Sequence, residues 1–174
     1  TASDNAGNAE TAPGTADVLV TVNTQANSTM TLNLSASTSS GDFPMESDLD
    51  VSVSLTNVTQ AGTLTISRSE DISGATAAGL NTNRLIDQYW TITPGSGLAF
   101  DSATITFDYD DTLLGGITES ELNTMFKVSG SSYTVENATV DTSANTITVT
   151  VSSFSDWYAG NNDAHVQQWL LLDD

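Results

Sequence analysis

The stretch TITVTVSSF at residues 146–154 decides the fold class, because threonine alternates with isoleucine and valine along it. Successive side chains of a β-strand point to opposite faces of a sheet, so this period of two predicts a strand with one buried and one solvated face. Sheets with one wet face are commonly antiparallel. The stretch therefore predicts an antiparallel all-β protein.

The same alternation recurs along most of the chain, with no helical crossover between the repeats. It is found at residues 18–24, 30–36, 50–58, 62–69, 87–93, 102–110 and 132–141, and VQQWLLLDD at 166–174 is expected to form a final strand. Strands at this spacing predict an antiparallel β-sandwich, Ig-like or jelly-roll-like, with about nine or ten strands. Gly41 and Pro44 break the pattern at SSGDFPMESDLD, and a short turn containing Gly62 predicts a hairpin between 50–58 and 62–69.

Three segments depart from the strand pattern. Residues 1–16 lack large apolar side chains, so we expect residues 1–17 to be a polar arm or linker and 18–174 to be one sandwich domain. The irregular stretch 70–86 leaves open a division into two small sandwiches. TESELNTMF at 118–126 predicts a short helix, capped by Thr118 or Ser120.

Composition limits the partners and the compartment. The 174 residues carry 22 acidic and 3 basic side chains, a formal charge of -19, which repels nucleic acid phosphates and anionic lipids. There is no cysteine, and no apolar run has the roughly 18 residues that span a bilayer. The first stretch, TASDNAGNAETAPGTA, is typical of a mature N-terminus after removal of a signal sequence. We expect a secreted protein, extracellular or on a cell surface, without membrane insertion.

The stretch 89–160 resembles a known class of module. It contains YWTIT, then ATITFDYDD, ESELNTMFKVSG, SYTVENATVD and NTITVTVSSFSDWYAG in that order. This succession is similar to the Ig-like β-sandwich modules of large exported microbial surface and matrix proteins. The resemblance implies a structural or adhesive role and carries over no active-site residues.

The chain has few groups that could perform catalysis. His165 is the only histidine, no G-x-S-x-G motif is present, and a serine nucleophile would therefore depend on His165. A pair of carboxylates across a cleft, as in glycosidases, stays open by residue type. We predict that the protein is not an enzyme.

Acidic turns are the candidate metal ligands. Asp108, Asp110, Asp111 and Glu119 predict a calcium site, because Ca²⁺ prefers several carboxylate and carbonyl oxygens on a loop. Neither these residues nor the second acidic cluster, at 42–50, has the spacing of an EF-hand loop. A solvated acidic turn is the competing interpretation.

Aromatic side chains are the candidate ligand-binding residues. Trp157, Tyr158 and Trp169 could stack on sugar rings as a glycan platform, whereas Trp90 in YWTIT suits a core position. Neighbouring Trp157 and Tyr158 point to opposite faces if they lie in a strand, which predicts that one of them is exposed.

Four sequons would permit glycosylation of a secreted chain. They lie at Asn27, Asn33, Asn57 and Asn137.

These patterns favour a structural function. Terminal strands at sheet edges invite addition of another strand, so we expect a homopolymer, a filament, pilus-like fibre or matrix, in which copies join by β-strand addition. The alternative is a carbohydrate-binding or adhesion module of a cell-surface protein.

Overall fold

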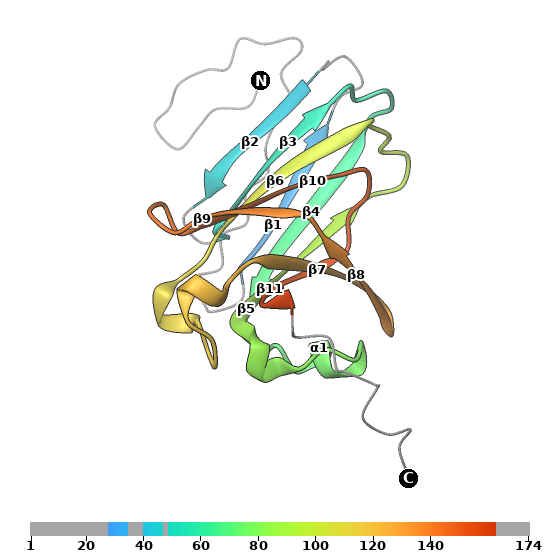
Figure 1. Ribbon diagram of the computed structural model, residues 1–174. Coiled ribbons are helices and arrows are strands. Elements are labelled where there is room, and N and C mark those ends of the chain that lie inside the picture. The colour runs from blue at the N-terminus through green and yellow to red at the C-terminus, as the bar shows by residue number, and fades with distance from the viewer. Residues whose placement is uncertain (1–27, 35–39, 47–48, 163–174) are drawn as a thin grey trace.

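Two antiparallel sheets pack face to face in the computed structural model, which describes residues 28–34, 40–46 and 49–162, with side chains for 49–162 (Figure 1). The larger sheet has six strands in the order β1-β4-β5-β11-β7-β8, and the smaller has five in the order β2-β3-β6-β10-β9. Every strand pairing is antiparallel. The predicted all-β sandwich is confirmed.

The strands follow the alternating stretches of the sequence closely. The six-stranded sheet contains β1 (Ser28–Leu34), β4 (Gly62–Ser69), β5 (Leu85–Pro94), β11 (Asp156–Gly160), β7 (Thr124–Ser129) and β8 (Ser132–Glu136). The five-stranded sheet contains β2 (Ser40–Glu46), β3 (Val51–Thr56), β6 (Ser102–Asp108), β10 (Thr146–Val151) and β9 (Ala138–Asp141).

Two differences from the expected strand pattern lie at residues 132–141 and at the stretch that contains Pro44. The predicted strand 132–141 is two strands, β8 and β9, because the chain passes at Asn137 from one sheet to the other. The stretch with Pro44, predicted to break the pattern, forms β2, which pairs with β3 across a register shift between Phe43 and Glu46. An edge strand tolerates a proline and a bulge because only one of its sides is hydrogen-bonded.

The core lies between the two sheets. Alternate side chains of β3, β4, β6 and β10 are buried there, as their burial patterns show. Trp90 and Trp157 are fully buried, and the Phe107 ring lies 4.8 Å from the Trp90 ring and 5.9 Å from the Trp157 ring. The predicted core position of Trp90 is confirmed.

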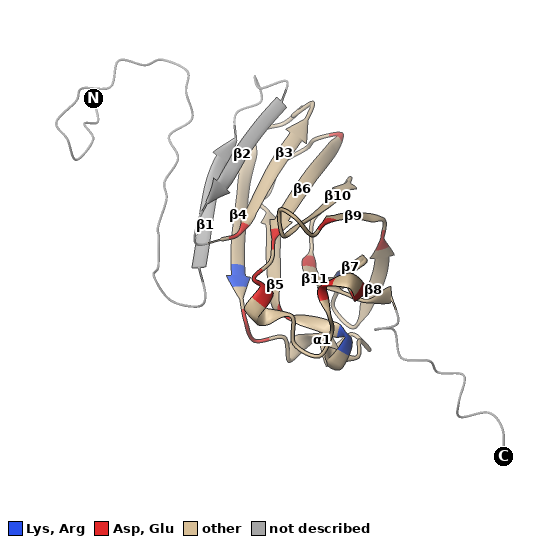
Figure 2. Ribbon diagram, turned by 60° about the vertical axis from the view of Figure 1, so that its left-hand side comes forward, with Lys and Arg blue, Asp and Glu red and all other residues tan. Residues whose placement is uncertain are grey.

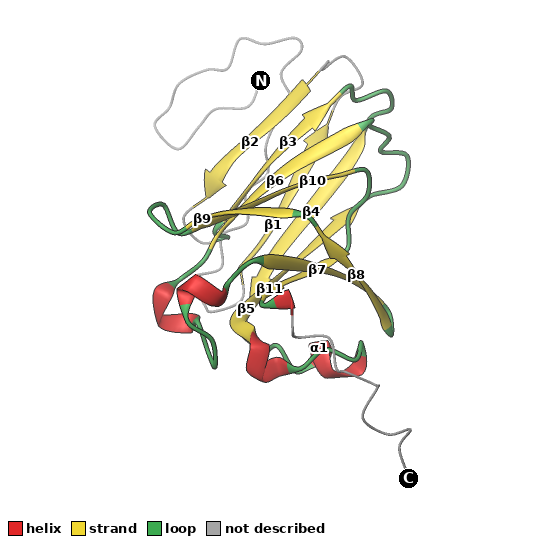
Figure 3. Cartoon of the chain, viewed as in Figure 1, coloured by secondary structure: helices red, strands yellow, loops and turns green. Residues whose placement is uncertain are grey.

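A second apolar layer covers the outer face of the six-stranded sheet. Residues 70–84 contain α1 (Gly74–Ala77) and the 3₁₀ turn η1 (Thr82–Arg84), which lie against the end of the sandwich (Figure 3). Ala75, Ala78 and Leu80 pack there on side chains that point outward from the sheet, namely Leu85, Phe126, Val128 and Tyr158. The segment joins β4 to β5, which are neighbours in one sheet, so it does not separate two sandwiches.

The predicted hairpin between 50–58 and 62–69 is wrong. β3 belongs to the five-stranded sheet and β4 to the six-stranded sheet, so residues 57–61 cross between the sheets. Val58 is buried, and the backbone N–H of Thr59 donates to the carbonyl of Ala99 at 2.8 Å. Alternation defines the inward face of each strand but not its neighbour.

The predicted helix at 118–126 is reduced to one 3₁₀ turn, η3 (Glu119–Glu121), followed by β7. The Glu121 carboxylate accepts hydrogen bonds from the backbone N–H and the hydroxyl of Thr118, both at 2.8 Å. The turn ends because the apolar side chains of β7 are buried in the sheet, which overrides local helix preference.

The last described strand, β11, completes the six-stranded sheet from the inside. It lies between β5 and β7 and pairs with both. Its final residue, Gly160, passes so close to the turn η1 that a Cβ atom there would clash with the Arg84 carbonyl oxygen. A side chain at this position is therefore excluded without backbone movement.

Candidate functional site

Acidic loops gather toward one end of the sandwich, where β6 ends (Figure 2). Asp108 closes β6, Asp110 precedes the 3₁₀ turn η2 (Asp111–Leu113), and Glu119 begins η3. The structure therefore places the predicted calcium ligands in one region. No group of three or more His, Cys, Asp or Glu side chains within residues 49–162 is arranged to hold a metal ion.

Two of these carboxylates are occupied by protein hydrogen bonds. Asp110 Oδ1 accepts from the backbone N–H of Thr112 at 2.7 Å and from its hydroxyl at 2.6 Å. These bonds lower the pKa of Asp110. Glu119 Oε1 accepts from the Tyr109 hydroxyl at 2.7 Å, and burial together with this contact raises the pKa of Tyr109. The calcium site stays a prediction, and Ca²⁺ would compete with these bonds.

The acidic end already contains a protein cation. Arg68 Nε lies 2.8 Å from Asp50 Oδ2, and Arg68 Nη1 lies 3.3 Å from Glu70 Oε1. Arg68 Nε makes no hydrogen bond within the described structure, so its contact with Asp50 is a short-range ion pair rather than an aligned N–H···O bond. The guanidinium thus places a positive charge, from β4, beside two carboxylates of this end of the sandwich.

Gln88 connects this ion pair to the calcium candidates. Its side chain is fully buried and donates to the Asp108 carbonyl oxygen at 3.3 Å and to Asp50 Oδ2 at 3.5 Å. Its carbonyl oxygen accepts from the Asp110 N–H at 3.3 Å. Sequence reasoning missed both Arg68 and Gln88. Each follows two-residue alternation onto an apolar inward face, and a polar residue there indicates a buried network.

Asp108 is expected to reduce stability at neutral pH. Burial, and then the charge of Asp110, raise the pKa of Asp108. A carboxyl with a higher pKa in the folded state favours folding when protonated, so its charge opposes folding above that pKa. Asp108→Asn should therefore raise the thermal midpoint at pH 7, and the gain should vanish as pH falls below about 4.

The control for this variant is Asp111→Asn, which removes the same charge from an exposed side chain. Thermal unfolding followed by circular dichroism at several pH values measures both. Equal shifts for the two variants would mean that general charge repulsion, not the burial of Asp108, sets the effect.

The exposed platform expected from Trp157 and Tyr158 is wrong. Their side chains do point to opposite faces, but Trp157 is 0% exposed in the core and Tyr158 is 3% exposed beneath the second layer. The Tyr158 ring stacks on Tyr89, with centroids 4.8 Å apart and planes 5° from parallel. Neither ring is available to a sugar in this structure. Trp169 and His165 lie outside the described residues.

Two of the four sequons lie on the described surface. Asn57 and Asn137 are both exposed, and the Asn57 amide donates to Asp101 Oδ2 at 2.8 Å. Asn33 lies in β1, whose side chains are not among those described, and Asn27 lies outside the described residues.

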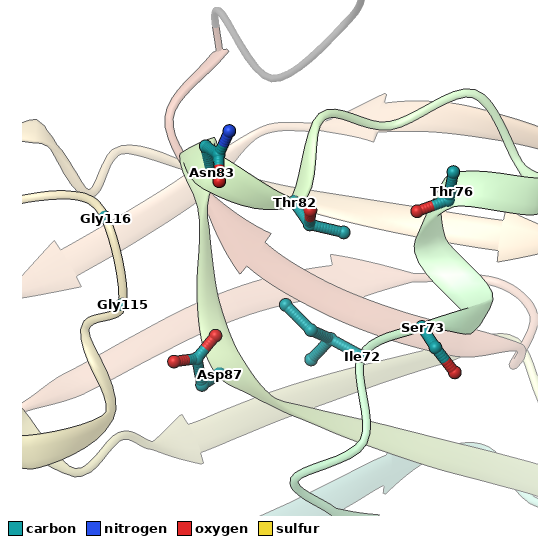
Figure 4. Close-up of a pocket in the computed structure, with 8 residues that line it drawn as sticks. All are labelled: Ile72, Ser73, Thr76, Thr82, Asn83, Asp87, Gly115 and Gly116. Atoms are coloured by element: carbon teal, nitrogen blue, oxygen red, sulfur yellow. The ribbon is translucent and has the colours of Figure 1, made fainter.

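A polar pocket of about 510 Å³ lies beside the second layer (Figure 4). Asp87 and Ile72 face it from the middle, and Gly115 and Gly116 form one side. Its remaining lining is hydroxyl and amide side chains, from Ser73, Thr76, Thr82 and Asn83. Such a lining can hydrogen-bond neutral hydroxyl compounds.

The sheets also have open edges. β1 and β8 are the outermost strands of the six-stranded sheet, and β2 and β9 those of the five-stranded sheet, within the described chain. The outer side of an edge strand carries backbone N–H and C=O groups that can pair with another strand.

Comparison with known proteins gives no relative: no family model, no curated protein and no solved structure matches this chain. The resemblance to exported surface modules therefore stays a prediction. Among the described residues, none of the helices has the length and apolar character needed to cross a bilayer.

Proposed function

We propose that this chain is a secreted structural subunit of an extracellular fibre or surface matrix, in which copies join by β-strand addition. The observation that supports it best is the open outer edge of β8 in the six-stranded sheet. An open edge accepts an extended strand through backbone hydrogen bonds, whatever the partner's side chains. The resemblance of residues 89–160 to modules of exported proteins supports the location.

The energetics of such a contact limit how it can form. Each added backbone hydrogen bond contributes about 0.5–1.5 kcal/mol net, whereas association costs at least about 4 kcal/mol in lost translation and rotation. A short strand pairing alone is thus weak, and apolar side chains of the donor must contribute. Each copy also carries a formal charge of -19, so salt should favour assembly by screening the repulsion.

The size of the purified chain in solution tests this function. We expect light scattering and negative-stain microscopy to find polymers that grow with protein concentration and form faster at about 0.5 M NaCl than at about 0.05 M. Adding millimolar Ca²⁺ reports separately on the acidic end. A monomer at every protein, salt and calcium concentration would contradict the proposal.

A carbohydrate-binding module is the second candidate, and the hydroxyl- and amide-lined pocket beside Asp87 favours it. A monomer whose saturable glycan binding falls on Asp87→Ala would support this candidate over the fibre.

A further inference from the structure

Three of the four sheet edges, β2, β9 and β8, differ in how well they are protected against pairing. The fourth edge, β1, is uncharged and has no register shift, but its side chains are not among those described. β2 carries Pro44, two acidic residues and a register shift, all of which hinder addition of a strand. β9 is only four residues long and ends in Asp141. β8 reads SYTVE, with no proline and a single charge at its last residue, and its pairing with β7 has no register shift.

The turn before β8 determines which backbone groups point outward. Gly130 has a φ of 62° and is the first of two residues between β7 and β8, as in a type II′ hairpin. The closing pair of such a hairpin, Ser129 and Ser132, is hydrogen-bonded. Hydrogen-bonded and non-hydrogen-bonded pairs then alternate along the two strands, so the pairs that contain Tyr133 and Val135 are of the non-hydrogen-bonded kind. The N–H and C=O groups of Tyr133 and Val135 therefore point away from β7, toward the open edge.

The same strand also exposes apolar surface. Val135 is 49% exposed and is the large hydrophobic side chain most open to solvent within residues 49–162. It lies opposite Phe126 of β7, whose ring packs edge-on against Tyr133 at 5.7 Å. A strand laid beside β8 would cover Val135 and pair with the outward backbone groups together.

We propose that β8 is the acceptor edge and that residues 18–24 of a second copy are the strand that pairs with it, an inference that rests on the proposed fibre function. The donor reads VLVTVNT, which is uncharged and alternates with a period of two. An uncharged strand meets the nearly uncharged β8 without the repulsion expected between copies of charge -19.

The order of the strands makes this pairing intermolecular. β1 and β8 are the opposite edges of the six-stranded sheet, five strand spacings or about 24 Å apart. Residues 24 and 28 can be separated by at most about 14 Å, so a donor tethered to β1 cannot lie along β8 of its own copy. A contact between two different edges is heterologous, and repeating it produces a filament or a ring.

Cross-linking between two variants tests the pairing, because the chain has no cysteine of its own. Val135→Cys protein is mixed with an equal amount of Val18→Cys, Val20→Cys or Val22→Cys protein and oxidised. We expect a disulfide-linked pair of the two different chains for at least one of these mixtures. The control replaces the acceptor with Thr139→Cys, an exposed position on the β9 edge, which should give no such pair.

A backbone variant provides the second readout. Val135→Pro removes an outward N–H that folding of one copy does not use, and should raise the concentration needed for polymers about tenfold or more. Val135→Thr keeps that N–H and should polymerise nearly as the parent chain does. Circular dichroism checks that both variants fold.

The outcomes separate the two proposals. A parent chain that never polymerises contradicts the fibre function itself. Polymers can form while the cross-links join residues 18–22 to β9 instead of β8, or while residues 18–22 form no cross-link. Either result would overturn the assignment of β8 as the acceptor edge but would not contradict the fibre function. A disulfide within one chain between Val135→Cys and Leu171→Cys would assign the edge to the chain's own C-terminal residues and would also overturn it.

Discussion

Trp90→Ala is expected to lower the free energy of unfolding by about 3–5 kcal/mol, the largest single effect among the core residues. The indole is fully buried between the sheets, where it packs on Phe107, and its Nε1–H donates to the Leu49 carbonyl at 2.8 Å. The substitution leaves a cavity and an unpaired carbonyl together. Urea unfolding followed by fluorescence and circular dichroism measures the loss.

The two buried tryptophans provide a matched control. Trp90→Phe leaves the Leu49 carbonyl without its hydrogen bond from the indole. It should lower the free energy of unfolding by about 1–3 kcal/mol beyond the small change in packing. Trp157→Phe should cost less, because Trp157 Nε1 is buried without a hydrogen-bond partner in the described part of the chain. A larger loss for Trp157→Phe would mean that the Trp157 indole donates to an acceptor outside that part.

Arg68→Met is expected to lower the free energy of unfolding by about 2–3 kcal/mol at pH 7. Removing one partner of a fully buried ion pair costs about 3–5 kcal/mol, and the partial exposure of the Asp50 carboxylate, 28%, reduces this. In this variant the Asp50 carboxylate, which lies 3.5 Å from the Gln88 amide nitrogen, loses its paired cation. Millimolar Ca²⁺ should raise the midpoint of this variant more than that of the parent chain, because the acidic end then lacks its own cation.

Two control variants test whether the loss comes from the ion pair of Arg68 with Asp50. Arg84→Met removes the Arg84–Glu121 contact of 3.4 Å, whose side chains are 42% and 39% exposed, and should cost much less stability than Arg68→Met because solvent screens the pair. Asp50→Asn in the Arg68→Met background should restore part of the lost stability, since it removes the unpaired charge. Equal losses for the two arginine variants would mean that the Asp50 pair is effectively solvated.

The sequence predicts where most strands lie and which of their faces is buried, but not which strands pair with one another. Threonine and valine alternation at 146–154 identifies β10 and its buried face, and similar patterns identify β3, β4 and β6. Which strands pair depends on contacts between residues distant in sequence, as when β11 inserts between β5 and β7. Alternation carries no information on such contacts, which is why the expected hairpin at Gly62 is a crossing between sheets.

The acidic residues of the candidate site could be predicted from the sequence, but their contacts could not. Acidic residues after β6 are visible in the sequence, but their hydrogen-bond partners Thr112 and Tyr109 and the ion pair of Asp50 with Arg68 depend on the folded chain. The burial of Tyr158 has the same origin, because the layer formed by residues 72–80 covers a sheet face that alternation alone assigns to solvent. Tertiary covering thus decides which aromatic side chains are accessible.

The single residue between β8 and β9 has a mechanical consequence. β8 belongs to one sheet and β9 to the other, and only Asn137 separates them (Figure 1). A pulling force applied to β8 therefore passes along the covalent backbone into the second sheet after one residue, with no slack loop to extend first. Both sheets of the sandwich therefore share tension applied to this edge, and β8 cannot be peeled away without loading the second sheet.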